Sequence, residues 1–284
     1  LAEKKPSEAA IEYKNALQLA PNDAKAHFGL AEAYLANKEA QKAFWEFQET
    51  VRLDGANLDA RLALGQFLLL GQEAEFEQAR EQGEAVIAAD PNRWEGYVLR
   101  AASLERLKRV DEAEPDYKKA LELQPERADL VRTLAGYYVR KGDRAAAEQL
   151  YVQLTQMDPG ATSQMLYASF LALDRLRDTD AEAAYQKALE VASDEQKSEV
   201  YQRIAAHYYA RERYDEAEQT LTSAVTARPG DLDLIYALAR FYHSRGDQTK
   251  ADTMIEQATS AKPNDVKPFL ILSAYRGRNG DLPG

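Results

Sequence analysis

Side chains that could catalyse a reaction or bind a metal are few in this chain and far apart. The three histidines, His27, His207 and His243, lie in different parts of the chain, so no two have the short helical spacing of a metal site. Cysteine is absent, which excludes thiolate nucleophiles and disulfides. Neither a glycine-rich phosphate loop nor a serine flanked by glycines in a nucleophile turn occurs. The sequence therefore predicts no catalytic residue, no metal site and no cofactor.

The remaining candidates for acid and base catalysis are the 47 aspartate and glutamate residues among 284 residues. We expect them on the solvent-exposed faces of amphipathic helices rather than paired in a site. With 36 lysines and arginines the net charge is −11, which repels a phosphate backbone and argues against nucleic acid as a partner. The longest aliphatic run, around Phe67 to Leu70, is far shorter than the roughly 20 residues of a membrane-spanning helix.

One short unit repeats along the whole chain. Eight alanines recur at a nearly constant interval, and a residue that favours the end of a helix follows each of them at the same distance. The alanines are Ala9, Ala43, Ala79, Ala113, Ala147, Ala181, Ala217 and Ala251, and the helix-ending residues are Pro21, Gly55, Pro91, Pro125, Pro159, Ser193, Pro229 and Pro263. Because each unit of such a stack contacts only its neighbours, we expect one elongated array rather than a single globular core.

Residues 24–57 illustrate the unit. Apolar residues in 24–35 follow a helical period, a polar break comes next, and a second helical pattern ends before Gly55. Ala31 is predicted to face Ala43, because helices that cross closely need small side chains at the crossing. Phe47, on the second helix, is predicted to wedge this unit against the next. The unit is therefore predicted to be two antiparallel helices.

The pattern resembles the tetratricopeptide repeat. Its positions are a large residue, Leu, a small residue, Tyr, Ala, an aromatic and Pro. The clearest matches are His27, Leu30, Ala31, Tyr34, Ala43 and Phe47; Val131, Leu134, Ala135, Tyr138, Ala147, Tyr151 and Pro159; and Tyr201, Ile204, Ala205, Tyr208, Ala217, Ala224 and Pro229. The resemblance implies an all-α fold, a right-handed α-solenoid of antiparallel helix pairs whose concave face is lined by the first helix of each pair.

We expect a single array of these repeats over residues 1–284. The complete repeats are predicted at 24–57, 58–93, 94–127, 128–161, 162–197, 198–231 and 232–265. Residues 1–23 would supply only the second helix of a repeat and residues 266–284 only the first, so both ends are expected to be cut from a longer array.

Three residues depart from the repeat pattern: Gly83 replaces the bulky wedge, Arg100 takes a position that is usually Leu, and Pro115 lies early in a second helix, where we expect it to delay or kink that helix. Two insertions of two residues interrupt the period. One falls between Leu70 and Ala79, and the other near Gln196 and Lys197. We expect both insertions to lengthen loops.

The resemblance to peptide-binding members of the family also implies which residues line the groove. The candidates from this set are Phe28, Leu62, Gln66, Arg106, Arg132, Arg140, Phe170, Tyr209, Tyr236, Arg240 and His243, and the same pattern includes Gln202 and Ala206. The lysines and asparagines that clamp a terminal carboxylate in chaperone-binding relatives do not occur in order. The mixture of apolar, aromatic and arginine residues suits a peptide or amphipathic helix with a few acidic residues. Alternatively, Phe28, Phe170 and Tyr236 only extend the core between repeats.

The predicted function is a non-catalytic scaffold that holds a segment of another protein. The phrases YKNALQLAPND and RLALGQFLLLGQ resemble bacterial envelope proteins of polysaccharide or protein export, which favours a periplasmic or envelope location over the cytoplasm. The alternative is a substrate-recruiting arm of a larger enzyme, similar to the repeat arm of glycosyltransferases, with its catalytic domain outside these residues. A third hypothesis is self-association through an exposed helix end.

Overall fold

In the computed structural model, residues 5–261 and residue 266 are described. This part contains α1 (Pro6–Leu19), α2 (Ala24–Ala36), α3 (Ala40–Leu53), α4 (Leu58–Leu68), α5 (Glu73–Ala89), α6 (Trp94–Arg106), α7 (Val110–Leu123), α8 (Ala128–Lys141), α9 (Arg144–Met157), α10 (Ala161–Leu171), the 3-10 turn η1 (Arg175–Arg177), α11 (Asp178–Val191), α12 (Asp194–Ala210), α13 (Tyr214–Ala227), α14 (Leu232–Ser244) and α15 (Gln248–Ala261). The all-α fold is confirmed. Apart from residue 266, the partial repeat predicted at 266–284 lies outside the described residues, as do residues 1–4 of the first one.

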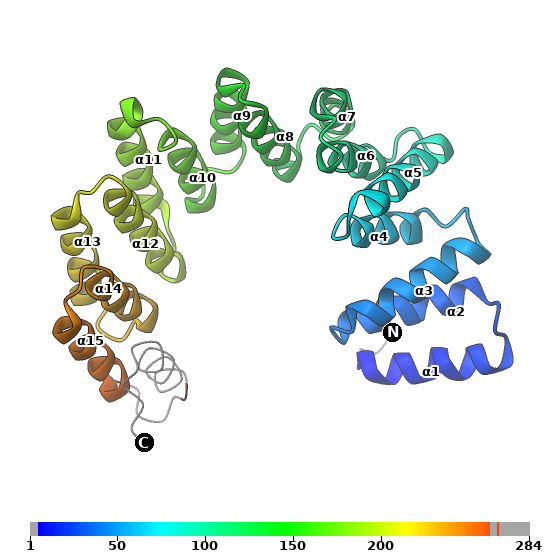
Figure 1. Cartoon of the computed structure of the whole chain (residues 1–284), viewed down its shortest axis with the longest axis horizontal. Helices are drawn as coiled ribbons and strands as arrows, with labels where there is room; N and C mark the ends of the chain where they lie inside the picture. Colours follow the sequence, from blue (N-terminus) through cyan, green and yellow to red (C-terminus); the bar gives the residue numbers. More distant parts are fainter. Residues whose placement is uncertain (1–4, 262–265, 267–284) are drawn as a thin grey trace. The chain divides into compact units, whose positions relative to one another are not determined.

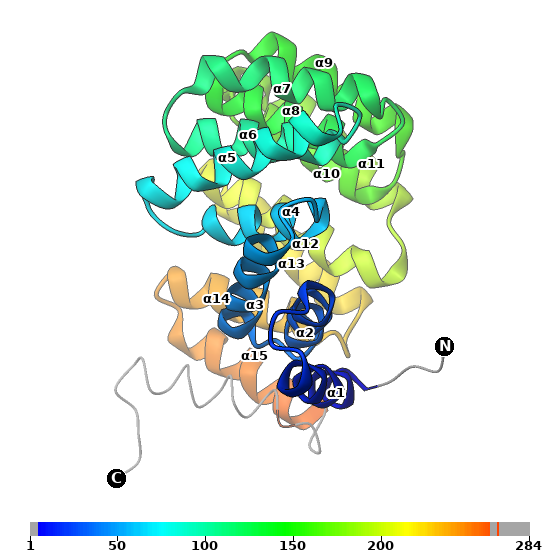
Figure 2. The same cartoon turned by 90° about the vertical axis from the view of Figure 1, so that its right-hand side faces the viewer.

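The helices form antiparallel pairs joined by short turns (Figure 1). The chain divides into two compact units, residues 1–150 and 151–284. In the first unit α2 packs on α3, α4 on α5 and α6 on α7; in the second, α10 packs on α11, α12 on α13 and α14 on α15. The view in Figure 2 shows the same pairing within each unit. These are the helix pairs of an α-solenoid, whereas the repeat boundaries themselves stay a prediction.

The recurring alanines lie where the two helices of a pair cross. They are fully buried from α3 onward, at Ala43, Ala79, Ala113, Ala147, Ala181, Ala217 and Ala251. Their small counterparts on the first helices are buried, with Ala31, Ala101 and Ala135 fully enclosed, except for Ser169, which is half-buried. A side chain larger than a methyl group would force these backbones apart. Ala9 on α1 is only half-buried.

The predicted helix-ending residues stand at a constant place. Pro21, Gly55, Pro91, Pro125, Pro159, Ser193 and Pro229 each lie two residues after the last residue of a second helix. Pro263 lies outside the described residues. A proline there cannot donate the backbone hydrogen bond that would extend the helix. The repeat therefore ends each second helix by local chemistry, before any packing is considered.

The insertions enter helices rather than loops, which corrects the sequence-based expectation. Gln196 and Lys197 lie inside α12, and the Gln196 side chain accepts a hydrogen bond from the backbone NH of Ser193 at 3.1 Å, which caps the helix early. At the other insertion, α5 begins six residues before Ala79, whereas α3 begins three residues before Ala43. Most of the added length therefore extends the first turn of a helix.

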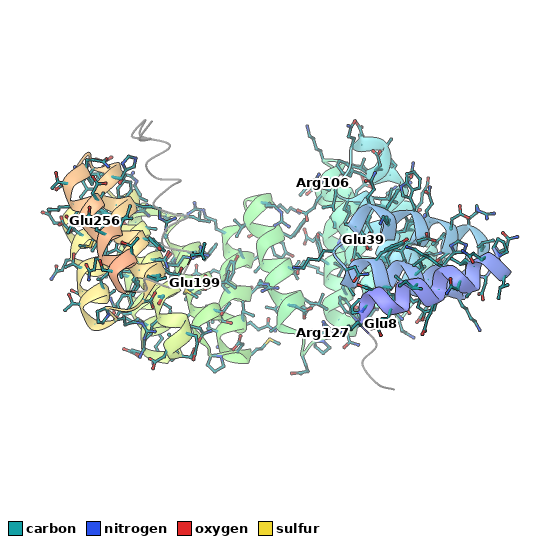
Figure 3. All side chains as sticks on the ribbon, turned by 90° about the horizontal axis from the view of Figure 1, so that it is seen from below. Glu8, Glu39, Arg106, Arg127, Glu199 and Glu256 are labelled. Carbon is teal, nitrogen blue, oxygen red and sulfur yellow. The ribbon has the colours of Figure 1, made fainter. Side chains whose placement is uncertain are left out.

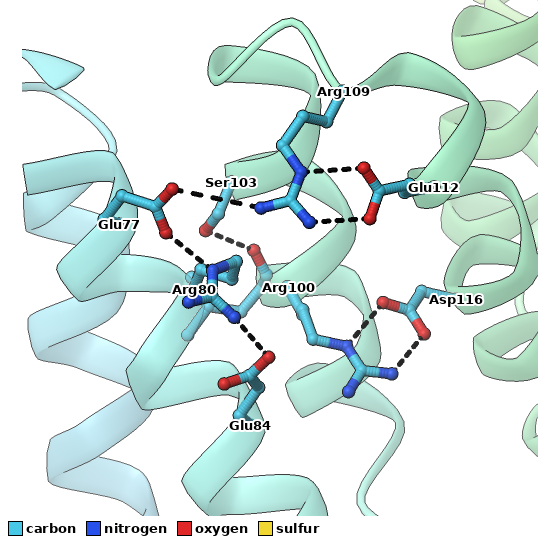
Figure 4. A network of polar contacts seen from close by, with 9 residues as sticks. Glu77, Arg80, Glu84, Arg100, Ser103, Arg109, Glu112 and Asp116 are labelled. Carbon is cyan, nitrogen blue, oxygen red and sulfur yellow. Dashed lines mark hydrogen bonds and ion pairs between the residues drawn. The ribbon is translucent and has the colours of Figure 1, made fainter.

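The departures from the repeat pattern compensate one another between α5, α6 and α7. A Cβ added at Gly83 would lie 2.9 Å from the backbone nitrogen of Arg100, so the glycine permits a close approach of α5 and α6. Arg100, in a usual Leu position, donates two hydrogen bonds of 2.7 Å to Asp116, whose side chain is nearly buried (Figure 4). Helix α7 begins at Val110, before Pro115, so this proline does not delay the helix.

A second polar network lies beside this ion pair. Arg80 on α5 pairs with Glu77 and Glu84 on the same helix, and Arg109 pairs with Glu112 at the start of α7 (Figure 4). Arg109 also lies 3.9 Å from Glu77. The pairs link α5 to the start of α7 across their exposed surfaces.

The turn inside each regular pair contains a residue with left-handed backbone conformation. Gly142 and Gly246 have φ values of 87° and 78°, and the same turn position holds Lys38, Lys108 and Glu212 at 63°, 61° and 61°. Non-glycine residues tolerate this region poorly because Cβ crowds the following carbonyl oxygen. These three turns therefore carry backbone strain that the glycine-containing turns avoid.

His27 on α2, the first helix of its pair, also binds the turn that precedes this helix. His27 donates from Nδ1 to Glu46 at 2.6 Å and from Nε2 to the carbonyl of Pro21 at 3.0 Å. Both partners are acceptors, so both ring nitrogens donate and the imidazole is positively charged. Burial alone lowers the pKa of His27, but the hydrogen bonds to Glu46 and Pro21 outweigh it and raise the pKa above the ordinary 6.5. The following repeats make the same tie with Arg61 to Gly55 and Tyr97 to Pro91.

Replacing a strained turn residue by glycine is expected to stabilise the fold. Lys108→Gly removes the Cβ that a left-handed φ disfavours, and we expect about 1 kcal/mol of added stability in urea unfolding followed by circular dichroism. Gly142→Ala, at the matching turn, is the control and is expected to lower the stability by a similar amount. Equal midpoints for the two variants and the parent would show that the turns carry no strain.

The His27 tie is expected to make stability depend on pH. Because the pKa is raised in the folded state, the stabilisation is complete below the ordinary value of 6.5 and is lost as pH rises through the folded value. We expect the free energy of unfolding of the parent, relative to His27→Gln, to fall over this rise in pH. Glutamine still donates to Glu46 but does not titrate. Parallel pH profiles for the two proteins would contradict the charged state of His27.

Candidate partner-binding site

In the first unit, two of the predicted groove residues belong to the core. Phe28 is half-buried, and its ring meets Phe47 edge-on at 5.9 Å. Leu62 is buried in the same hydrophobic cluster as Phe47. Both side chains therefore hold neighbouring helices together. The surroundings of Phe28 are those expected under the alternative in which it extends the core between repeats.

The predicted arginines of the first unit are exposed, but two of them contact neighbouring side chains. Arg140 on α8 forms two hydrogen bonds of 2.8 and 2.9 Å with Glu105 on α6, which joins the first helices of neighbouring pairs. Arg106 lies over the ring of Phe76 at 4.5 Å. Arg106 and Arg127 stand at opposite edges of this unit (Figure 3). Gln66 and Arg132 are exposed.

In the second unit, part of the predicted groove forms a pocket. It lies between the first helices α12 and α14, with Leu221 of α13 also contributing, and has a volume of about 570 Å³. Of the predicted site residues it contains Tyr209 and Arg240. Its lining is Glu199, Gln202, Arg203, Ala205, Ala206, Tyr209, Leu221, Ala237, Arg240, Phe241 and Ser244. Pockets of about 300–1,000 Å³ with a mostly apolar lining and a few polar groups are typical of ligand sites.

The pocket combines an apolar floor with an aromatic end. Ala205, Leu221 and Ala237 are buried, and the short side chains of the two alanines leave the space open. Tyr209 is 37% exposed, and its ring meets Phe241 edge-on at 6.1 Å. An exposed aromatic ring held by a second ring is a rigid apolar surface, which is what an incoming side chain requires.

The other end of the pocket is polar. Arg203 pairs with Glu199 one turn earlier on α12 at 3.4 Å, and both side chains are more than half exposed. Arg240 on α14 donates to the amide oxygen of Gln202 at 3.4 Å. Glu199 marks this part of α12 in Figure 3. The arginines therefore sit at the pocket with only weak interactions to the protein itself.

The other predicted residues of the second unit lie elsewhere. Tyr236 is buried in the hydrophobic cluster of α13 and α14, and Phe170 packs against Tyr151 with ring centres 5.0 Å apart. Both side chains are buried. His243 is exposed, and its Nδ1 lies 3.3 Å from the side-chain oxygen of Gln248. None of the three lines the pocket.

Sequence reasoning missed several lining residues. Glu199 and Arg203 were not singled out, although they lie on the same helix as Gln202 and Tyr209. Phe241 was missed because the repeat assigns its position to packing, and here it forms both core and pocket wall. The signal that would have found Arg203 is its place beside Gln202, at the edge of the groove-facing stripe of α12.

The remaining histidine, His207, is a packing residue. It is 5% exposed and lies between the rings of Tyr185 and Tyr208, at 5.6 and 5.8 Å. Burial lowers its pKa, which favours the neutral form. Over residues 5–261 and residue 266, no group of three histidine, aspartate or glutamate side chains is placed to hold a metal ion.

Two tetratricopeptide repeat models match the chain. One matches residues 1–44, 104–170 and 208–272, and the other matches residues 64–128. No curated protein matches it. Within the part that the structure describes, no helix has both the length and the apolar character needed to cross a bilayer.

Solved structures of repeat proteins share the fold. Yeast Tom70 is 17% identical with a TM-score of 0.64, over 96% of this chain and 59% of that one. A tetratricopeptide repeat protein from Parabacteroides merdae is 13% identical with a TM-score of 0.57, over 88% and 97%. PilF from Pseudomonas aeruginosa is 19% identical with a TM-score of 0.53, over 74% and 94%. These identities show the fold alone, but together with the repeat models and the buried alanines they lead to one conclusion: the chain belongs to the tetratricopeptide repeat family.

Proposed function

We propose that this protein is a non-catalytic scaffold that holds a peptide or helical segment of a partner protein between α12 and α14. Tetratricopeptide repeat proteins are in general adaptors, and the fold implies protein partners. The observation that carries the proposal is the pocket of about 570 Å³, where the groove positions Gln202, Ala206, Tyr209 and Arg240 come together.

The pocket has the features of a recognition site for a side chain. Its floor of alanines and Leu221 offers apolar burial, and Tyr209 supplies a partly exposed aromatic ring. Aromatic and arginine residues contribute most of the binding energy in many protein interfaces. In the first unit, by contrast, Phe28 and Leu62 are packed into the core and Arg140 is bound to Glu105. The second unit therefore offers the better site for a partner segment.

Filling the pocket is expected to remove partner binding. Ala206 is exposed on α12, so Ala206→Trp places an indole in the pocket without burying it in the core. We expect proteins that the immobilised parent captures to be lost by this variant, with an unchanged circular dichroism spectrum. Ala183→Trp, at an exposed position on α11, is the matched control and is expected to capture the same proteins as the parent. Identical capture by all three proteins, quantified by mass spectrometry, would contradict the proposal.

A further inference from the structure

The pocket is a basic site on an acidic protein. The whole chain has a net charge of −11, whereas the pocket lining contains two arginines and one glutamate. An acidic protein repels acidic partners at long range. The local pair of arginines therefore makes this pocket a place where a negatively charged group can approach the surface. The charge of the lining is therefore the opposite of that of its surroundings.

Arg240 lacks the carboxylate partner that three other cross-helix arginines of the described chain have. Arg100 binds Asp116, Arg140 binds Glu105 and Arg211 binds Asp178, each through its guanidinium and a carboxylate. Arg240 instead donates to the neutral side-chain amide of Gln202, at the long distance of 3.4 Å. A guanidinium presents five donors and pairs best with a carboxylate in a forked geometry. Arg240 therefore retains donors that a carboxylate from outside can use.

Arg203 reinforces this charge. Its carboxylate partner is Glu199 on the same helix, at 3.4 Å and with both side chains exposed. Exposed pairs one helical turn apart stabilise a protein only weakly, so Arg203 can turn toward a partner at little cost. The residues that these two arginines contact, Gln202 and Glu199, lie seven and ten residues before Tyr209 on α12.

The distance between the polar and aromatic ends sets the spacing in the ligand. Along α12, Tyr209 lies three residues beyond Ala206 and seven beyond Gln202, which corresponds to about 5 and about 10 Å at 1.5 Å per residue. These are one and two turns of a helix. A second helix laid along the groove presents residues three, four or seven positions apart on one face at the same spacing.

From these observations we infer that the partner segment is an amphipathic helix that places a large apolar side chain against Tyr209 and Phe241. One or two turns away on the same face it carries an aspartate or glutamate, whose carboxylate binds Arg240 and Arg203. This inference rests on the proposed function and names the partner chemistry of the same pocket. The apolar side chain supplies the burial, and the carboxylate sets register and direction.

The test uses a displayed library of random peptides of about 16 residues, long enough for roughly four helical turns. The full chain, Ala206→Trp and Arg240→Glu are panned in parallel. Peptides selected by the parent are expected to carry an acid three, four or seven positions from Leu, Phe, Tyr or Trp. Arg240→Glu is expected to weaken their binding by roughly tenfold, and replacing the acid of the peptide by Lys is expected to restore it. Amidating the C-terminus of the peptide is expected to change nothing.

The controls separate the two proposals. Arg175→Glu makes the same charge change at an exposed position outside the pocket and is expected to leave binding unchanged. Suppose that Ala206→Trp abolishes binding but the peptides show no acidic preference, or that Arg175→Glu and Arg240→Glu weaken peptide binding equally. The inferred partner chemistry is then wrong, and the proposed function stands. If amidation of the C-terminus abolishes binding, the pocket binds a terminal carboxylate, and the inference of an acidic side chain is overturned. If Ala206→Trp still binds the peptides, or panning selects none, both proposals fall.

Discussion

The close crossing of two helices within each pair is the constraint on which the rest of this protein depends. At each crossing from α3 onward the second helix places a fully buried alanine, and the first helix opposes it with a small residue. A methyl group lets the two backbones approach so that the flanking apolar side chains interlock at native packing density. Four residues later, Phe47, Tyr117 and Tyr185 are buried against neighbouring helices. The same two contacts, repeated, build each unit.

The pocket follows from the same geometry. First helices lie next to one another because each is packed on its own second helix, and α12 and α14 are in contact in this way. Between them the groove-facing side chains Ala206 and Ala237 are short, and Leu221 lies below, so space remains. In the first unit a long side chain takes up the corresponding space between first helices, as Arg140 on α8 does when it reaches Glu105 on α6. A small change in side-chain size on a fixed scaffold thus separates a closed contact from a site.

The sequence predicted what depends on period and local chemistry. The buried alanines were predictable because they share one face of each helix. The prolines two residues after most second helices were predictable because a proline lacks the backbone donor. The left-handed turn at Lys38, Lys108 and Glu212 was not predictable, because nothing in a lysine or glutamate side chain indicates a positive φ. The place of the insertions was also missed, because a capping interaction such as that of Gln196 with Ser193 lets a helix start earlier.

The candidate site was harder to predict than the fold for a related reason. Periodicity tells which side chains lie on one face of a helix, but Phe170 and Tyr236 share apolar character with Tyr209 and differ only in what covers them. Whether an arginine is available also depends on a partner from another helix, as Glu105 is for Arg140. Both questions concern contacts between units of the repeat, which a single unit does not specify.

The dependence of the fold on close crossing is tested most directly by enlarging one buried alanine. Ala181 and Ala183 lie two residues apart on α11, the first fully buried and the second exposed. Urea unfolding of Ala181→Leu is expected to show a loss of about 1–3 kcal/mol or more, because the extra carbons must push α10 and α11 apart. Ala183→Leu is expected to unfold like the parent within about 0.5 kcal/mol. Equal stability of the two leucine variants would contradict the account.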